Sequence, residues 1–221
     1  MDNRLNVKSI SDMRKALFIL FTLLACSVYY NLYQHYLLIK YSNYCLSYTD
    51  RTKDLEFKLE VANRKLTTYY TLEREVSWII SKSSGQHSAK VLRHLAQLEI
   101  ASAKASRIPL SVGLAISIKE SHFKTASVSY NGSSYGVKMI NFHAHRDLVT
   151  NKLMLFNPYF NVPVGYKILS GYTKNFHGLR TGLEHYYGSN DKVDNLRYAN
   201  SVLKMSNRIK QQIILRDFEN D

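Results

Sequence analysis

The stretch LSVGLAISIKESHF, Leu110–Phe123, decides the fold of the C-terminal half of this chain. Apart from two serines and a glycine it is apolar as far as Ile118, and Pro109 just before it favours the first turn of a helix. We predict a short buried helix that ends at Glu120. Burial of a carboxyl group raises its pKa and keeps it protonated near neutral pH, as a general acid requires. Glu120 is the predicted catalytic residue, and the alternative is an exposed glutamate in the last helical turn.

Several short motifs follow this helix within the span of one domain. A turn-rich segment comes first, because serine, asparagine and glycine favour turns. Predicted helices follow it. The motifs, in order, are SVSYNGSSYG (127–136), VKMI (137–140), Asn157-Pro158, Asn161-Val162, Val164-Gly165, LEHYYG (183–188) and YANSV (198–202).

In this order the motifs resemble those of the soluble lytic transglycosylase (SLT) family, which has a goose-type lysozyme-like fold. Glu120–Phe123 matches the family's Glu-Ser-x-Phe at the end of a hydrophobic helix, and Gly136–Ile140 matches its Gly-Leu-Met-Gln-Ile. Leu183–Gly188 matches the helix that carries Ala-Tyr-Asn-Ala-Gly. The resemblance covers roughly residues 92–205 and implies a mainly α-helical, lysozyme-like domain.

The resemblance implies that Glu120 is catalytic and that five residues bind substrate: Ser129, Tyr135, Met139, Asn161 and Tyr186. The residue types leave second interpretations open. Tyr186 also suits core packing, Asn161 also suits the N-cap of a helix that begins at Val162, and Ser129 and Tyr135 also suit an ordinary turn.

Three residues depart from the family pattern at positions expected to lie in the groove. Met139 stands where the family has a glutamine that contacts substrate, Lys138 replaces the family's methionine, and Tyr187 replaces the asparagine after its tyrosine. The departures leave open a domain that binds glycan without cleaving it.

Glycoside cleavage ordinarily uses two carboxylates, but the only other acids between Glu120 and Asp191 are Asp147 and Glu184. Asp147 follows an arginine in a polar stretch that we expect to be a loop, and Glu184 is expected to face solvent. The resemblance implies that one glutamate acts twice. It protonates the glycosidic oxygen between N-acetylmuramic acid (MurNAc) and N-acetylglucosamine (GlcNAc), and then takes the proton of the muramic 6-hydroxyl as a 1,6-anhydro ring closes.

The resemblance implies no metal and no organic cofactor. His143 and His145 lie close together, as the histidines of a metal site often do. No neighbouring carboxylate–histidine pattern accompanies them, so we predict that both are surface residues.

No charged residue occurs from Ala16 to Ile39. As a helix this segment is about 36 Å long at ~1.5 Å per residue, which spans a hydrocarbon core of ~30 Å. Four basic residues precede it and only Lys40 follows closely, which places the N-terminus in the cytoplasm and the remainder in the periplasm or its equivalent. Two alternatives are a lipoprotein signal, since Leu23–Cys26 resembles a lipobox, and a buried structural helix.

Between Asp50 and Ile80 the chain contains an a/d heptad seam. It favours either a stalk that pairs two chains through residues 55–80, or one amphipathic helix that lies on the domain after it. The seam consists of Leu55, Leu59, Ala62, Leu66, Tyr69, Glu73, Val76 and Ile80, and Glu73 interrupts it. The small polar residues Ser81–Ser88 are predicted to form a linker.

The predicted organisation has five parts. They are a basic leader (1–15), a transmembrane helix (16–39), a helical stalk with its linker (40–88), the lytic transglycosylase-like domain (89–205) and a tail (206–221).

Composition excludes several classes of protein. With 45% hydrophobic and 21% charged residues the chain is not disordered, and its two cysteines exclude a disulfide scaffold. A net charge of +13 favours an anionic partner such as peptidoglycan or a lipid surface. The basic residues are scattered, so we predict no nucleic-acid binding. The alternatives to a transglycosylase are an inactive glycan-binding tether and a lysozyme-type hydrolase.

Overall fold

The computed structural model describes residues 4–85 and 87–219, with side chains for 12–85 and 87–213. In this part of the chain there are six α-helices, one short 3-10 helix and one two-stranded sheet. The predicted mainly α-helical class is confirmed. The chain divides into two compact units, residues 1–64 and 65–221.

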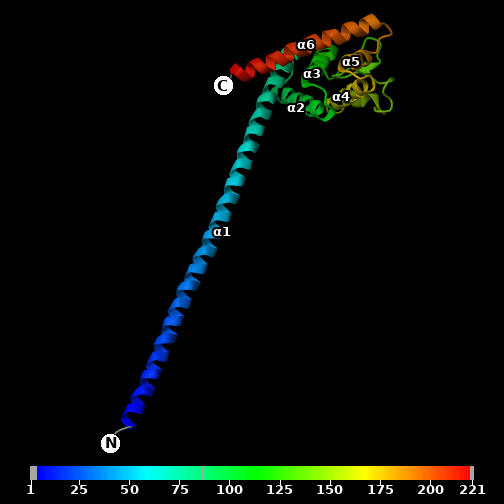
Figure 1. Cartoon of the computed structure of the whole chain (residues 1–221). Coiled ribbons are helices and arrows are strands. Elements are labelled where there is room, and N and C mark those ends of the chain that lie inside the picture. The colour runs from blue at the N-terminus through cyan, green and yellow to red at the C-terminus, as the bar shows by residue number, and fades with distance from the viewer. Residues whose placement is uncertain (1–3, 86, 220–221) are drawn as a thin grey trace. The chain divides into compact units, whose positions relative to one another are not determined.

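Helix α1 (Arg4–Ser84) is continuous through the predicted membrane segment and stalk (Figure 1). In the described residues it is the one helix long and apolar enough to cross a membrane, by length and composition. Its large apolar side chains are exposed, including Phe18 at 73% and Phe21 at 72%.

The last turns of α1 belong to the core of the second unit. Val76 and Ile80 are fully buried and Ile79 is nearly so, whereas Leu66 is half exposed. The C-terminal part of the seam therefore packs on the domain, as the amphipathic-helix alternative expects, and is not available to pair two chains. The compact unit consequently begins well before residue 89.

The segment between α1 and the next helix is shorter than the predicted linker. α1 extends to Ser84, and Ser88 caps helix α2 (Ala89–Ser106) by accepting a hydrogen bond from the amide of Val91. Gly85, with φ of 64°, ends α1 in a conformation that other residues adopt only with strain.

Helix α3 (Leu110–Ser121) lies at the centre of the domain, with every residue from Val112 to Ser117 buried. It packs against α2 and against α6 (Lys192–Glu219). Helices α4 (Pro158–Asn175) and α5 (Leu179–Tyr187) complete the bundle, α4 against α2 and α5 against both α4 and α6 (Figure 1). Helix α6 continues past residue 206, and its Ile209 is buried, so the first part of the expected tail belongs to the core.

The segment between α3 and α4 forms a small lobe. Strands β1 (Ser134–Tyr135) and β2 (Ile140–Asn141) pair antiparallel, followed by the 3-10 helix η1 (Lys152–Phe156). Gly136 joins the strands with φ of 78°, and a Cβ there would lie 2.1 Å from the carbonyl oxygen of Leu155. The turn therefore requires glycine. A second apolar cluster supports the lobe: Tyr135, Ile140, Val149, Leu155 and Ile168.

Candidate active site

Glu120 occupies the last turn of α3, where the chain reverses direction. His122 and Phe123 have positive φ angles of 51° and 61°, and the Phe123 ring is fully buried. The hydroxyl of Ser121 donates a hydrogen bond to the carbonyl of Val137 at 2.8 Å. The helix end is thus fastened to the loop that forms one wall of a cavity.

This cavity of about 190 Å³ lies between the small lobe and helices α3, α4 and α5. Ten residues line it: Glu120, Ser129, Ser134, Met139, Ile140, Asn141, His145, Ile168, Tyr186 and Tyr187. Among these described residues Glu120 is the one carboxylate.

The environment of Glu120 favours its protonated form. Burial raises the pKa of this carboxyl above the ordinary value of a glutamate. Three weaker effects act in the opposite direction: a hydrogen bond from Tyr198, and the charges of Lys119 and Lys138. The desolvation effect exceeds them, which is the direction that a general acid needs.

Tyr198 on α6 is the residue that holds Glu120. Its hydroxyl donates a hydrogen bond to Oε1 of Glu120 at 2.5 Å. The Tyr198 ring is stacked on that of Tyr187, with centroids 4.6 Å apart and planes at 16°. In the sequence Tyr198 belongs to the last motif, which by itself predicts no role for it. The signal is its position four residues before Val202, on one buried helix face.

Three of the predicted substrate-binding residues line the cavity with Glu120. The hydroxyl of Ser129 accepts hydrogen bonds from the amides of Ser133 and Ser134, at 3.0 and 2.9 Å, so it also builds the turn. Met139 adopts a positive φ of 46°. Tyr186 donates its hydroxyl hydrogen to the carbonyl of Lys138 at 2.9 Å, so this bond is to the loop and not to Glu120.

The other two predicted substrate-binding residues, Tyr135 and Asn161, do not line the cavity. Asn161 is fully buried inside α4, whose N-cap is Asn157. Its side chain accepts from the amide of Lys138 at 2.7 Å and donates to the carbonyl of Tyr135 at 2.9 Å. Asn161 therefore fixes the loop behind the cavity, while the Tyr135 ring packs in the second apolar cluster.

Lys138 is not a groove residue, contrary to our expectation. It is 1% exposed, and its ammonium lies 2.9 Å from Oε1 of Glu99, which is fully buried on α2. The ammonium also donates to the carbonyl of Gly113, and Glu99 accepts from Ser117 and Tyr166. The sequence signal for this pair was a glutamate on the apolar face of α2.

The polar residues outside the motifs are dispersed. His145 lines the cavity, whereas His143 contacts Arg146. Asp147 is exposed and Glu184 is half-buried, and neither lines the cavity. The described residues contain no cluster of three metal-ligating side chains.

The family model described as "Transglycosylase SLT domain" matches residues 97–207, about half of the chain. This range includes the cavity, Glu120 and Tyr198. No curated protein and no solved structure matches the chain.

Proposed function

The chain belongs to the transglycosylase SLT family, and from this premise we propose that it is a membrane-anchored lytic transglycosylase that uses Glu120 to cleave peptidoglycan. The family supports peptidoglycan as the substrate and lytic transglycosylase as the enzyme class. The bond cleaved in this proposal is the β-1,4 link between MurNAc and GlcNAc, and the product ends in 1,6-anhydro-MurNAc.

The observation that carries the proposal is a half-buried carboxyl with a raised pKa in a cavity that contains no second carboxylate among its lining residues. Hydrolysis ordinarily uses a second carboxylate, either to activate water or to form a covalent intermediate. Intramolecular ring closure needs neither, because the nucleophile is the 6-hydroxyl of the substrate itself.

In the first step, protonated Glu120 gives its proton to the glycosidic oxygen as the bond to the muramic C1 breaks, which releases the GlcNAc hydroxyl. The ionised carboxylate, which accepts a hydrogen bond from Tyr198, then removes the proton of the 6-hydroxyl. The oxygen of that hydroxyl bonds to C1. Glu120 ends protonated, so one residue serves as acid and then as base.

The membrane anchor in the proposal is the apolar segment of α1. The basic residues before it favour a cytoplasmic N-terminus in the inner membrane, with the catalytic domain in the periplasm. Cleavage and lipidation at Cys26 is the alternative anchor.

The test is digestion of purified sacculi with the full chain in detergent, followed by mass analysis of the sugar ends. We expect anhydro-ended muropeptides from the wild type and none from Glu120→Gln, with Glu184→Gln as the matched control that keeps activity. Equal release by wild type and Glu120→Gln would refute the assignment of the acid. Reducing ends would indicate a lysozyme-type hydrolase, and no release by the wild type would indicate a tether.

A further inference from the structure

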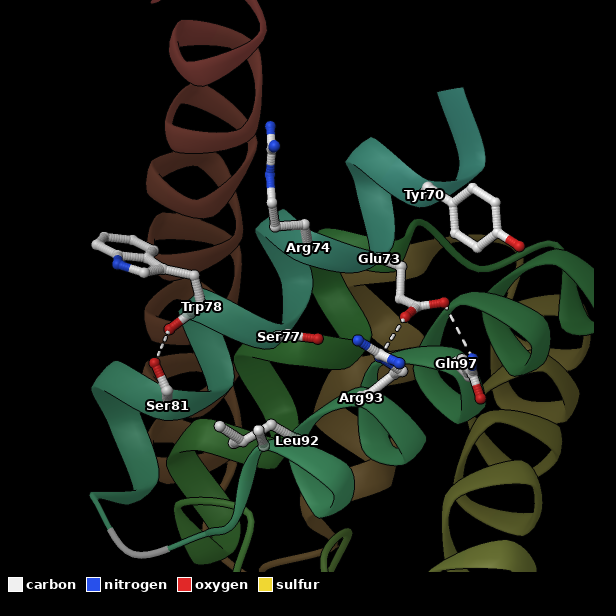
Figure 2. A pocket seen from close by; sticks show the side chains of 10 residues that line it. Tyr70, Glu73, Arg74, Ser77, Trp78, Ser81, Leu92, Arg93 and Gln97 are labelled. Carbon is white, nitrogen blue, oxygen red and sulfur yellow. Dashed lines mark hydrogen bonds and ion pairs between the residues drawn. The ribbon is translucent and has the colours of Figure 1, made fainter. Parts of the chain in front are cut away.

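A second and larger cavity, of about 650 Å³, lies between the last turns of α1 and the start of α2 (Figure 2). We name it the α1–α2 groove. None of its lining residues also lines the cavity of Glu120. Its volume is in the range of ligand sites, roughly 300–1,000 Å³. The residues that form it are Tyr70, Glu73, Arg74, Ser77, Trp78, Ser81, Ala89, Leu92, Arg93 and Gln97.

Two aromatic rings flank the groove. Figure 2 shows Tyr70 and Trp78 on opposite sides of the view, both on α1. Eight residues of a helix rise about 12 Å at ~1.5 Å each, a span comparable with the length of a disaccharide. Tyr70 is 59% exposed, so its ring is available to a ligand. Aromatic rings of this kind present a flat apolar surface together with a polar edge.

The polar side chains at the centre of the groove are held by contacts to one buried glutamate. Glu73 is only 6% exposed, and its two carboxylate oxygens bind different partners on α2. Oε1 pairs with Arg93 at 3.2 Å, and Oε2 accepts from Gln97 at 3.0 Å (Figure 2). This explains why a glutamate interrupts the heptad seam: it orients an arginine and an amide toward the groove.

Charge also characterises the groove. Arg74 pairs with the buried Glu75 at 3.6 Å, and Arg93 pairs with Glu73 at 3.2 Å. Their side chains nevertheless remain 62% and 70% exposed, so both guanidinium groups can still meet a ligand. Guanidinium groups bind carboxylates with two parallel hydrogen bonds. Of the molecules that a peptidoglycan enzyme meets, the peptide-bearing glycan strand combines sugar rings with carboxylates on its stem peptides.

We propose that the α1–α2 groove is a second peptidoglycan-binding site, which holds an uncleaved stretch of strand by its sugar rings at Tyr70 and Trp78 and by its stem carboxylates at Arg74 and Arg93. The inference rests on the proposed function. A second site on the same domain keeps the polymer at high local concentration after each cut.

Trp78 is the chain's one tryptophan, so its fluorescence reports on this groove directly. The experiment titrates the full-length Glu120→Gln chain, in neutral detergent, with soluble tetrasaccharide muropeptides that carry stem peptides. We expect a saturable change in Trp78 fluorescence. Tyr70→Ala/Arg74→Ala should weaken this binding about tenfold, or ~1.4 kcal/mol, because the double variant removes one ring and one guanidinium group of the proposed contacts. The matched control is Tyr159→Ala/Lys104→Ala, an exposed tyrosine and lysine outside the groove.

A flat fluorescence titration, or equal affinity in both double variants, overturns the inference. A saturable response to short-chain phosphatidylglycerol, with none to muropeptides, overturns it in favour of a lipid headgroup. Reduced affinity for glycan lacking stem peptides, with affinity retained when the peptides are present, supports the assignment to the arginines. The titration and the sacculus digestion can fail independently of each other. The titration uses the Glu120→Gln variant, which is expected not to cleave, and the digestion does not depend on Trp78.

Discussion

Lys138 and Glu99 form a buried ion pair, so substitutions there are expected to have large effects on the stability of the domain. Lys138 lies 2.9 Å from Glu99 and also binds the carbonyl of Gly113 at 2.7 Å. Its amide and carbonyl hold the wall of the cavity through Asn161 and Tyr186. The proposed perturbations are Lys138→Met, which restores the residue of the resembling family, Glu99→Gln, and the two combined.

The expected loss of stability in each variant depends on which charge stays buried without its partner. Removing one partner of a buried pair costs about 3–5 kcal/mol, because the other charge stays buried without compensation. Lys138→Met leaves Glu99 with the hydroxyls of Ser117 and Tyr166, so we expect about 3 kcal/mol, the lower end of that range. Glu99→Gln leaves an ammonium with few partners, and we expect about 4 kcal/mol. The double variant removes both charges and should lie within about 1 kcal/mol of the wild type.

Thermal unfolding followed by Trp78 fluorescence measures these differences in the second unit. At roughly 2–4 °C per kcal/mol, Lys138→Met should lower Tm by about 6–12 °C. Unchanged Tm in both single variants, or a double variant no more stable than the worse single variant, would refute the assignment of a coupled buried pair.

The pH dependence of Glu99→Gln gives an independent check. Burial lowers the pKa of Lys138, and the charge of Glu99 opposes this effect. Without Glu99 the pKa of Lys138 falls further, so the folded state binds fewer protons than the unfolded state up to the unfolded pKa of about 10.4. Stability rises with pH in that window. The Tm deficit of Glu99→Gln should therefore be smaller at about pH 9.5 than at about pH 7.

Three further predictions concern the site and the membrane topology. Tyr198→Phe removes the hydrogen bond that lowers the pKa of Glu120, so the basic limb of the pH profile of kcat/KM on sacculi should move to higher pH. The control is Tyr186→Phe, which should leave the limb in place because the Tyr186 hydroxyl bonds a main-chain carbonyl and not Glu120. Tyr187→Asn removes the ring stacked on Tyr198 and should cost about 1 kcal/mol in chemical unfolding, whereas Tyr187→Phe should cost much less. Alkaline phosphatase fused after Asp221 should be active in cells, and activity of a cytoplasmic reporter at that position instead would reverse the proposed orientation.

The parts of the fold that follow from local sequence could be predicted. Helix α3, its end beside Glu120 and the glycine turn at Gly136 each depend on a few adjacent residues, so pattern and turn chemistry identify them. The end of α1 could not be assigned, because its heptad seam shows an apolar face but not which surface covers it. The structure shows that the partner is the chain's own domain, around Val76 and Ile80.

The site contacts that escaped prediction join residues far apart in the sequence. Tyr198 lies 78 residues from Glu120, and Lys138 lies 39 residues from Glu99. A spacing rule within one helix does not report on such pairs. The packing of α6 on α3 brings the first pair together, and the Lys138 side chain reaches from the small lobe to Glu99 on α2 in the second. For the same reason the sequence predicts a substrate ligand or a helix cap at Asn161, although its side chain bonds the backbone of Lys138 and Tyr135.

The three residues that depart from the family motifs lie in two different parts of the domain. Lys138 is compensated internally, because Glu99 neutralises it and Gly165 makes room for its stem: a Cβ at Gly165 would lie 2.8 Å from the Cβ of Lys138. Met139 and Tyr187 instead line the cavity, where a thioether and a phenol replace two amides. A less polar wall disfavours the ionised carboxylate of Glu120, and so favours the protonated form that the proposed first proton transfer needs. These replacements therefore change which groups the Glu120 cavity presents to the sugar hydroxyls, but they preserve the raised pKa of Glu120. For this reason we expect them to alter substrate preference rather than to abolish catalysis.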